Sequence, residues 1–151
     1  MKKFTLVPLS FFDKEKTYQI LSDAVRLEAT DKVYYKELPE QEAVLVYAAA
    51  SESDLPPVAG LLEALGRIAD HNKVVAAVER GAVHIVLAEG DRLLLANAYP
   101  APDAVTAEYF LFATLKQFQL NPAVTTVYFL GEAPYELLND LFRYFKGVER
   151  L

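Results

Sequence analysis

The stretch that decides the fold is residues 74–99, VVAAVERGAVHIVLAEGDRLLLANAY. It holds runs of β-branched and large aliphatic residues that are separated by the short turns Arg80-Gly81 and Gly90-Asp91. Such runs are typical of strands, and a two-residue turn that contains glycine joins antiparallel neighbours. The stretch therefore predicts a meander of strands over residues 74–79, 82–89 and 92–99.

Two alternations of helix and strand are expected after this meander. Asp103 is the expected N-cap of a helix over residues 104–119, and the nearly all-apolar residues 125–130 predict a strand buried on both faces. A last helix is expected over residues 135–145. The helical spacing of apolar positions predicts a core of Ala107, Leu111, Leu115, Phe118, Leu137, Leu138, Leu141, Phe142 and Phe145, with Tyr109 and Phe112 widening the first stripe. The order β-β-β-α-β-α predicts an α/β fold with a mixed sheet.

The first half of the chain predicts a strand at residues 4–9 and a helix at 14–25 that buries Tyr18, Leu21 and Val25. Two β-type runs, at 32–38 and 43–48, either pair as a hairpin or lie in separate parts of one sheet. A helix is expected over residues 56–71, opened by Ser53-Asp54. Polarity rises at residues 70–73, where the apolar period changes from helical to strand spacing. We therefore expect a lobe boundary there, between residues 1–72 and 73–151.

The composition excludes several classes of protein. The chain has 151 residues, of which 53% are apolar, and its 15 Lys and Arg against 21 Asp and Glu give a net charge of −6. This balance argues against a nucleic acid or an anionic membrane as partner. The sequence contains no cysteine, which fits a reducing cytoplasm, and no run approaches the ~20 apolar residues of a membrane span. We expect a soluble cytoplasmic protein.

Residues able to carry catalysis or hold a metal are few. His84 lies in the middle of an expected strand and His71 at an expected helix end, so both are interpreted as structural. The serines do not occur in a nucleophile-elbow motif. The acidic segments 51–54 and 89–91 fit a helix cap and a hairpin turn. We predict no catalytic residue and no metal site.

Phosphate-binding motifs of the strong kind are also absent from the sequence, since neither Gly-x-x-x-x-Gly-Lys-Ser/Thr nor Gly-x-Gly-x-x-Gly occurs. Two weaker glycine turns remain. One follows Glu79 and contains Gly81, and the other, Gly131-Glu132, joins the buried strand to the last helix. A junction from strand to helix presents free N–H groups and a positive dipole to an anion, although Glu132 works against a phosphate.

Several segments resemble an uncharacterised family of Bacteroidetes proteins whose members look like the actin-like ATPase (ribonuclease H-like) fold. The resemblance lies in residues 82–97 (AVHIVLAEGDRLLLAN), 108–112 (EYFLF) and 127–132 (VYFLGE), and earlier in 4–8 (FTLVP) and 38–47 (LPEQEAVLVY). It runs along nearly the whole chain. Family members carry a further meander before the segment that begins here at Phe4, so the resemblance implies the later part of a two-lobed body. Residues 1–72 would then be a partial first lobe, and 73–151 the second.

The resemblance also implies how a nucleotide would be held, and here the sequence departs from the pattern. The second phosphate loop is normally Asp-x-Gly followed by glycine and threonine, whereas this chain has Glu79, Arg80 and Gly81. The adenosine loop is normally a glycine pair, whereas this chain has Gly131-Glu132. The first phosphate loop would lie in the missing meander. We interpret the chain as an actin-like fold that has lost the ATPase activity, because little remains to position a magnesium–phosphate group.

Two functional hypotheses follow. In the first, the chain is a non-catalytic module that binds a protein partner or self-associates, because an incomplete lobe leaves a sheet edge to be covered. Its candidate contact residues are Tyr34, Tyr35, Tyr99, Tyr135 and Tyr144. In the second, it retains binding of ATP and magnesium or ATPase activity, with Gly81 and Gly131 bracketing the ligand and Glu79 as the surviving acid. The sequence requires no cofactor under the first hypothesis.

Overall fold

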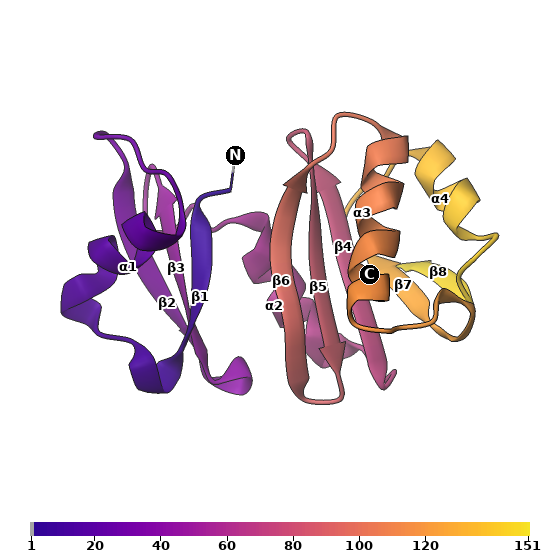
Figure 1. The fold of residues 1–151 in the computed structure, drawn as a ribbon, viewed down its shortest axis with the longest axis horizontal. Coiled ribbons are helices and arrows are strands. Elements are labelled where there is room, and N and C mark those ends of the chain that lie inside the picture. Colours follow the sequence, from indigo (N-terminus) through magenta and orange to yellow (C-terminus); the bar gives the residue numbers. More distant parts are fainter. Residues whose placement is uncertain (1) are drawn as a thin grey trace. The chain divides into compact units, whose positions relative to one another are not determined.

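The computed structural model describes residues 2–151 (Figure 1). The chain forms two compact units, Met1–Ala59 and Gly60–Leu151, and each is described by itself. The division falls inside the helix α2 (Pro57–Ala64), earlier than the polar segment 70–73. The assignment of 1–72 and 73–151 as lobes of an actin-like body stays a prediction.

The first unit is built on a three-stranded antiparallel sheet of order β1-β3-β2. Its strands are β1 (Phe4–Pro8), β2 (Lys32–Leu38) and β3 (Ala43–Ala49). β2 and β3 pair from Lys32 opposite Ala49 to Leu38 opposite Ala43, so these runs form a hairpin. The connecting turn is a 3-10 helix (Pro39–Gln41) that ends at Glu42 in the left-handed region, with φ of 51°.

The helix α1 (Thr17–Ala24) covers one face of this sheet. It follows a 3-10 turn (Lys14–Lys16) that the Asp13 carboxylate caps by accepting from the Glu15 N–H. Leu21 packs with Val44 and Val46 of β3 in a core that excludes Tyr18. The prediction that Tyr18 is buried was wrong, because the helix starts at Thr17 and Tyr18 lies in its first turn, where it is exposed.

The second unit is a five-stranded mixed sheet of order β6-β5-β4-β7-β8. The predicted meander is confirmed as β4 (Asn72–Glu79), β5 (Ala82–Glu89) and β6 (Arg92–Pro100), all antiparallel. β7 (Thr126–Phe129) pairs parallel to β4, and β8 (Gly147–Arg150) pairs parallel to β7. The sequence analysis missed β8, which adds one strand to the predicted order β-β-β-α-β-α. As predicted, β7 is an inner strand, and Val127 and Phe129 are buried on its helix-covered face, but Tyr128 on the other face is only half-buried.

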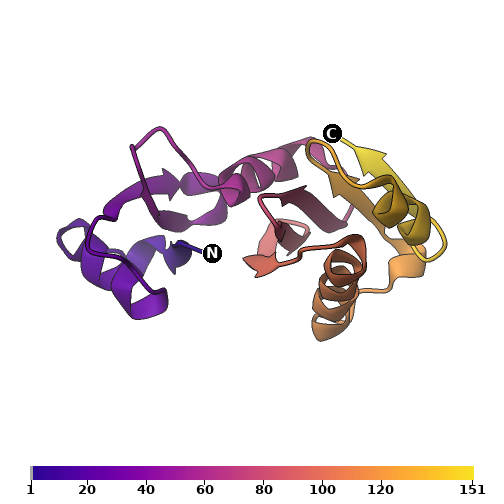
Figure 2. The same ribbon diagram turned by 90° about the horizontal axis from the view of Figure 1, so that it is seen from above.

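Two helices, α3 (Ala104–Gln117) and α4 (Tyr135–Leu141), cover one face of the five-stranded sheet. Figure 2 shows α3 against that face with the sheet seen nearly end-on. The core between helices and sheet is formed by alternate strand residues and the inner stripe of each helix, including Val83, Ile85, Leu87, Leu111, Leu115, Phe129, Leu137 and Leu141. The predictions that Tyr109 and Phe142 belong to this core were wrong, since both side chains are exposed.

The helices are shorter than the apolar periodicity suggested. The segment expected to be one helix over 56–71 is α2 followed by a 3-10 turn (Leu65–Arg67). As a result His71 is not at a helix end, and its carbonyl accepts from the Gly90 N–H at 2.8 Å in the turn between β5 and β6. Among residues 2–151, no helix combines the length and the apolar character that crossing a membrane requires.

Candidate functional site

The two glycine turns lie at the same end of the second unit's sheet. β4 and β7 are parallel neighbours with Ala76 opposite Phe129, so the turn after Glu79 and the turn at Gly131 both follow the carboxyl ends of their strands. The Leu130 N–H donates to the Ala76 carbonyl at 2.9 Å and continues the pairing up to the glycine. Carboxyl ends of adjacent parallel strands are where ligands bind in α/β sheets. The structure therefore brings the predicted turns together at one edge.

The turn at Gly81 has the geometry of a tight hairpin. Arg80 and Gly81 both have positive φ, at 55° and 71°, which is the requirement of a type I′ turn between antiparallel strands. The Gly81 carbonyl accepts from the Ala101 N–H at 2.8 Å, so the chain leaving β6 is fastened to the same turn. The hairpin alone explains the glycine.

The turn at Gly131 also has a left-handed backbone, with φ of 80°. The next side chain, Glu132, is exposed and pairs with Arg150 at the end of β8, with 2.7 Å between Oε1 and the guanidinium nitrogen. Because both side chains are largely in water, this ion pair contributes little to stability. It does place a carboxylate beside the glycine, where an anionic ligand would be repelled.

Helix N-termini near this edge already hold acidic groups. Asp103 caps α3 by accepting from the Thr106 N–H at 2.8 Å, and the hydrogen bonding to Thr106 lowers the pKa of the Asp103 carboxyl. This carboxylate occupies the position where a phosphate would meet the dipole of the helix. α4 has only seven residues, with Glu136 in its first turn. The edge therefore presents negative groups at both helix ends.

Glu79 lies on the sheet face opposite to α3 and α4. Val74, Ala76 and Val78 of β4 pack with those helices, so the alternate positions, which include Ala77 and Glu79, point the other way. His84 of β5 is directly opposite Ala77 and shares this face. Glu79 is thus on the other side of the sheet from the helix-covered face, and His84 lies on its side.

His84 is buried, with 7% of its surface exposed, and neither ring nitrogen has a hydrogen-bond partner among the described residues. Burial lowers the pKa of the His84 imidazole, Glu79 raises it by a smaller effect, and Arg80 lowers it further. Burial therefore favours the neutral form of this imidazole, and its structural role stays a prediction. The buried imidazole also lowers the stability of the folded state, since a buried polar group without a partner loses its hydrogen bonds to water.

Replacement of this imidazole is expected to stabilise the protein. His84→Leu removes both unpartnered nitrogens at similar volume and should raise the free energy of unfolding at pH 7 by about 1–2 kcal/mol, measured by urea denaturation. In the wild type, the unfolded state binds the proton more readily than the folded state. The contribution of His84 titration to stability is therefore fully present above about pH 6.5. It is lost as the pH drops below that value. The variant should lose this part of the pH dependence.

The chain offers a matched control for the His84 substitution, because His71 is its only other histidine and is exposed. At pH 7 and at pH 5, the urea midpoint of His71→Gln should stay close to that of the wild type. A His84→Leu protein that is less stable than the wild type at pH 7 would contradict the proposed cost of the buried imidazole.

A second substitution tests whether Gly131 is needed for its backbone. A Cβ added at Gly131 would meet nothing within 4 Å, so Gly131→Ala should cost only the strain of a left-handed residue, about 1–2 kcal/mol of unfolding free energy. Gly66 is the matched control, since its surroundings are equally open and its φ is not positive. Gly66→Ala should be neutral or slightly stabilising. Both variants are compared with the wild type by thermal unfolding. Equal changes in unfolding free energy for Gly131→Ala and Gly66→Ala would contradict the expected backbone strain at position 131.

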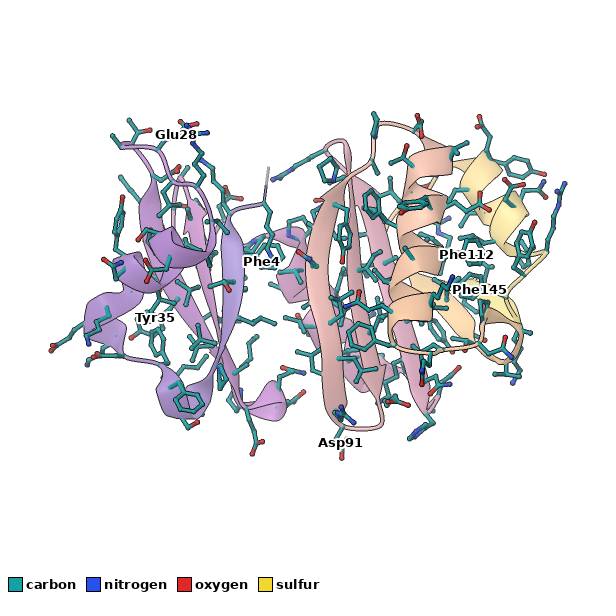
Figure 3. The ribbon with its side chains drawn as sticks, viewed as in Figure 1. Phe4, Glu28, Tyr35, Asp91, Phe112 and Phe145 are labelled. Atoms are coloured by element: carbon teal, nitrogen blue, oxygen red, sulfur yellow. The ribbon has the colours of Figure 1, made fainter. Side chains whose placement is uncertain are left out.

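The acidic segments considered as metal sites have structural roles. Residues 51–54 form a turn before α2, in which the Asp54 N–H donates to the Ser51 carbonyl and the Glu52 carbonyl accepts from the Tyr47 hydroxyl. Asp91 stands at the tip of the turn between β5 and β6 (Figure 3). Within the described residues 2–151, no three His, Cys, Asp or Glu side chains are grouped to hold a metal ion.

The tyrosines expected at a contact surface divide into two sets. Tyr135 is 78% exposed and Tyr144 is 54% exposed, whereas Tyr34 and Tyr99 are half-buried. Tyr99 stacks on Phe110 of α3 with 4.6 Å between ring centroids, and Tyr35 packs on Phe12 at 4.9 Å. The sequence analysis missed Tyr109, which is 65% exposed although it was assigned to the core. The sequence held a signal for this exposure. Tyr109 is two positions from both Ala107 and Leu111, and residues two apart point to opposite sides of a helix.

Comparison with known families identifies the chain. The family described as "Protein of unknown function (DUF3822)" matches residues 1–53 and 56–148. The chain belongs to this family. No curated protein sequence matches it significantly.

Two solved structures resemble this DUF3822 chain. A Bacteroides thetaiotaomicron VPI-5482 protein, described as having an actin-like ATPase fold and unknown function, aligns with a TM-score of 0.81 at 20% identity and covers 100% of this chain. A chain of the PilM-PilN type IV pilus biogenesis complex aligns with a TM-score of 0.57 at 15% identity over 99% of this chain. The matches span 65% and 66% of those chains, so this chain covers less than two thirds of their length.

These likenesses confirm the predicted family of unknown function and the predicted actin-like fold. At sequence identities this low, structural similarity establishes the fold alone. The position of Gly81 and Gly131 at one sheet edge is compatible with the nucleotide loops that the resemblance implied. Their role, with that of Glu79 and Glu132, stays a prediction.

Proposed function

We propose that the chain is a non-catalytic actin-like module that binds a protein partner or assembles with itself in the cytoplasm. The observation that carries this proposal is the acidic character of the edge where a nucleotide would lie. Asp103 already occupies the N-terminus of α3, and Glu132 stands beside Gly131. Electrostatic stabilisation of a triphosphate requires positive groups at these positions.

Three further observations support protein binding. Both units expose aromatic side chains, and in the second unit these include Tyr109 on α3, Tyr135 at the start of α4 and Phe142 just after its end. Tyrosine is enriched among the few residues that dominate the binding energy of protein interfaces. The net charge of −6 argues against nucleic acid as the partner. The structural neighbour in the PilM-PilN complex shows that a related fold occurs in a protein assembly.

The alternative function is residual nucleotide binding. It is favoured by one observation, the placement of the Gly81 and Gly131 turns at the carboxyl ends of neighbouring strands. Under this alternative Glu79 would be the acid near the phosphates, and magnesium would accompany ATP.

Titration calorimetry separates the two functions. The chain is titrated with ATP and magnesium chloride, and its thermal unfolding is recorded with and without the nucleotide. The proposed function predicts no heat and no shift in melting temperature. Saturable heat that disappears in a Gly131→Glu variant would establish the alternative.

Size-exclusion chromatography with light scattering, combined with quantitative mass spectrometry of co-purifying proteins, tests the binding function directly. We expect either a mass above that of the monomer or a partner present in stoichiometric amount. A strict monomer that brings no partner through purification would overturn the proposal.

A further inference from the structure

The strand β6 forms one edge of the second unit's sheet. Within that sheet it pairs with β5 alone, at one end of the order β6-β5-β4-β7-β8 (Figure 1). It is also the longest strand of the sheet, with nine residues, RLLLANAYP, of which one is charged. A long apolar edge is a template on which a further strand can add, and folded proteins protect such edges.

The pairing with β5 determines which backbone groups of β6 point outward. The Ala101 N–H donates to the Gly81 carbonyl at 2.8 Å, so the backbone of Ala101 faces β5. Backbone groups alternate between the two sides along an antiparallel strand, and the pairing is regular over this part of β6. Those of Pro100, Ala98 and Ala96 therefore face away from β5, toward any strand that approaches the edge.

Two of these three outward positions offer no free N–H. Pro100 has none, because its nitrogen lies in the ring. The Ala98 N–H donates to the Oδ1 atom of the preceding side chain, Asn97, at 2.9 Å. Ala96 is the position with no such bond within the second unit. An incoming strand needs a donor and an acceptor at each outward position, so this half of the edge is poorly matched to it.

Asn97 stands where the pattern of its neighbours favours an apolar residue. It is opposite Ile85 of β5, so its side chain starts on the face of the sheet that α3 and α4 cover. Leu95 and Tyr99, two positions away on either side, pack against the core on that face. The Asn97 amide instead accepts from the Ala98 N–H at the edge of the sheet.

We propose that Asn97 is an autoinhibitory cap on the β6 edge, which prevents a further strand from adding there. An incoming strand must displace the Asn97 amide from the Ala98 N–H before it can accept that hydrogen bond. Two other features of β6 assist, the charged Arg92 at its start and the β-bulge that shifts its register between Leu87 and Ala88 of β5. The inference goes beyond the proposed function and does not depend on it, because it concerns an edge through which the chain does not bind.

The strand that the cap excludes is β6 of a second copy of this chain. A twofold axis at Ala96 would pair the two edges antiparallel and join two five-stranded sheets into one. Charge does not oppose this pairing, because Arg92 of each copy would lie opposite Pro100 of the other. The Ala98 N–H is needed on both copies, so the cap acts twice in each symmetric pair.

Asn97→Ala removes the cap, and analytical ultracentrifugation over a range of concentrations compares its self-association with that of the wild type. We expect association beyond the wild-type species, with an association constant at least fivefold higher. The reason is that each copy gains a free donor, and one net hydrogen bond changes an equilibrium by about two- to tenfold. Sedimentation identical to that of the wild type at every concentration would overturn the proposal.

Amide hydrogen exchange followed by NMR shows whether the β6 edge is involved. In the dilute wild type, the Ala98 N–H should exchange more slowly than the Ala96 N–H, although both face outward. In dilute Asn97→Ala both should exchange fast, and both should become protected as the protein associates. Equal exchange at the two positions of the wild type would contradict the cap, as would association that leaves Ala96 unprotected.

Asn121→Ala is the matched control, because it removes the same kind of bond away from β6. The Ala123 N–H donates to the Asn121 Oδ1 atom at 3.0 Å, in the turn before β7. This variant should lose comparable stability in thermal unfolding and keep the association of the wild type. Equal association of Asn121→Ala and Asn97→Ala would assign the effect to lost stability and refute the cap.

A double variant, Asn97→Ala with Ala98→Pro, tests the role of the Ala98 N–H itself. Proline removes this donor, and an edge strand tolerates it where the N–H faces outward. We expect the double variant to return to wild-type association. A double variant that unfolds at the temperature of Asn97→Ala and still associates as strongly would overturn the proposal.

Discussion

Replacement of Phe129 by alanine is expected to lower the free energy of unfolding of the second unit by about 3–5 kcal/mol. Phe129 is fully buried and belongs to β7, an inner strand that lies between β4 and the edge strand β8. Its side chain packs in the core with residues of α3 and α4. Truncation removes the favourable transfer of the ring from water and leaves a cavity that these packed elements fill only partly.

Urea denaturation followed by circular dichroism measures this loss. The control is Val124→Ala, a truncation in the turn just before β7, where the side chain is exposed. We expect the control to change the unfolding free energy by less than about 0.5 kcal/mol. A Phe129→Ala protein within 1 kcal/mol of the wild type would be incompatible with complete burial of the Phe129 side chain in the core.

Leu21→Ala is expected to lower the stability of the first unit by about 2–5 kcal/mol. Leu21 is the fully buried residue of α1, and it packs with Val44 and Val46 of β3. The first unit has only this helix and a three-stranded sheet around that core. Loss of one anchor therefore removes a large share of the contacts that hold α1 on the sheet.

Amide hydrogen exchange locates the effect of Leu21→Ala within the chain. The core around Leu21 and the core of the second unit have no residue in common. We therefore expect faster exchange in α1 and β3 and unchanged protection in β5. Tyr18→Ala, at an exposed position of the same helix, should leave exchange in β3 unaltered. Uniform acceleration over both units would show that they unfold together and would refute this localisation.

Strands were predicted more accurately than helices, for a physical reason. The type I′ turn at Arg80-Gly81 and the turn at Gly90 punctuate the sequence chemically, so β5 has the predicted bounds of 82–89. The end of a helix, by contrast, depends on how far it packs against the rest of the fold, which local sequence does not specify. The apolar residues up to Ile68 continue a helical spacing, but the chain leaves the α-helix at Ala64 and passes through a 3-10 turn.

The misplaced aromatic residues show what apolar patterning lacks. Tyr109 and Phe142 were assigned to the core because they are aromatic and near the apolar stripe, yet both are exposed. A helix that packs on a sheet buries only part of its circumference, and the pattern does not say where that part stops. Their exposure became visible only when both helices were in place on the sheet.

The candidate site shows the same division. The sequence identified Gly81 and Gly131 as turns, and their positive φ values agree with that interpretation. Short strands far apart in the chain do not reveal their neighbours, and β8 was missed because four residues carry little pattern. The salt bridge from Arg150 to Glu132 depends on the parallel pairing of β8 with β7, so no reading of local sequence predicts it.

By itself the sequence determined the α/β class, the meander, the resemblance to an actin-like family and the absence of strong nucleotide motifs. These properties follow from local patterns of apolar residues and turn residues, which act over a few positions. The tertiary structure decided which turns share a sheet edge, which carboxylates stand at helix ends and which aromatic side chains stay in water. Those properties depend on contacts between residues far apart in the chain, such as Ala76 with Leu130 and Phe112 with Tyr144.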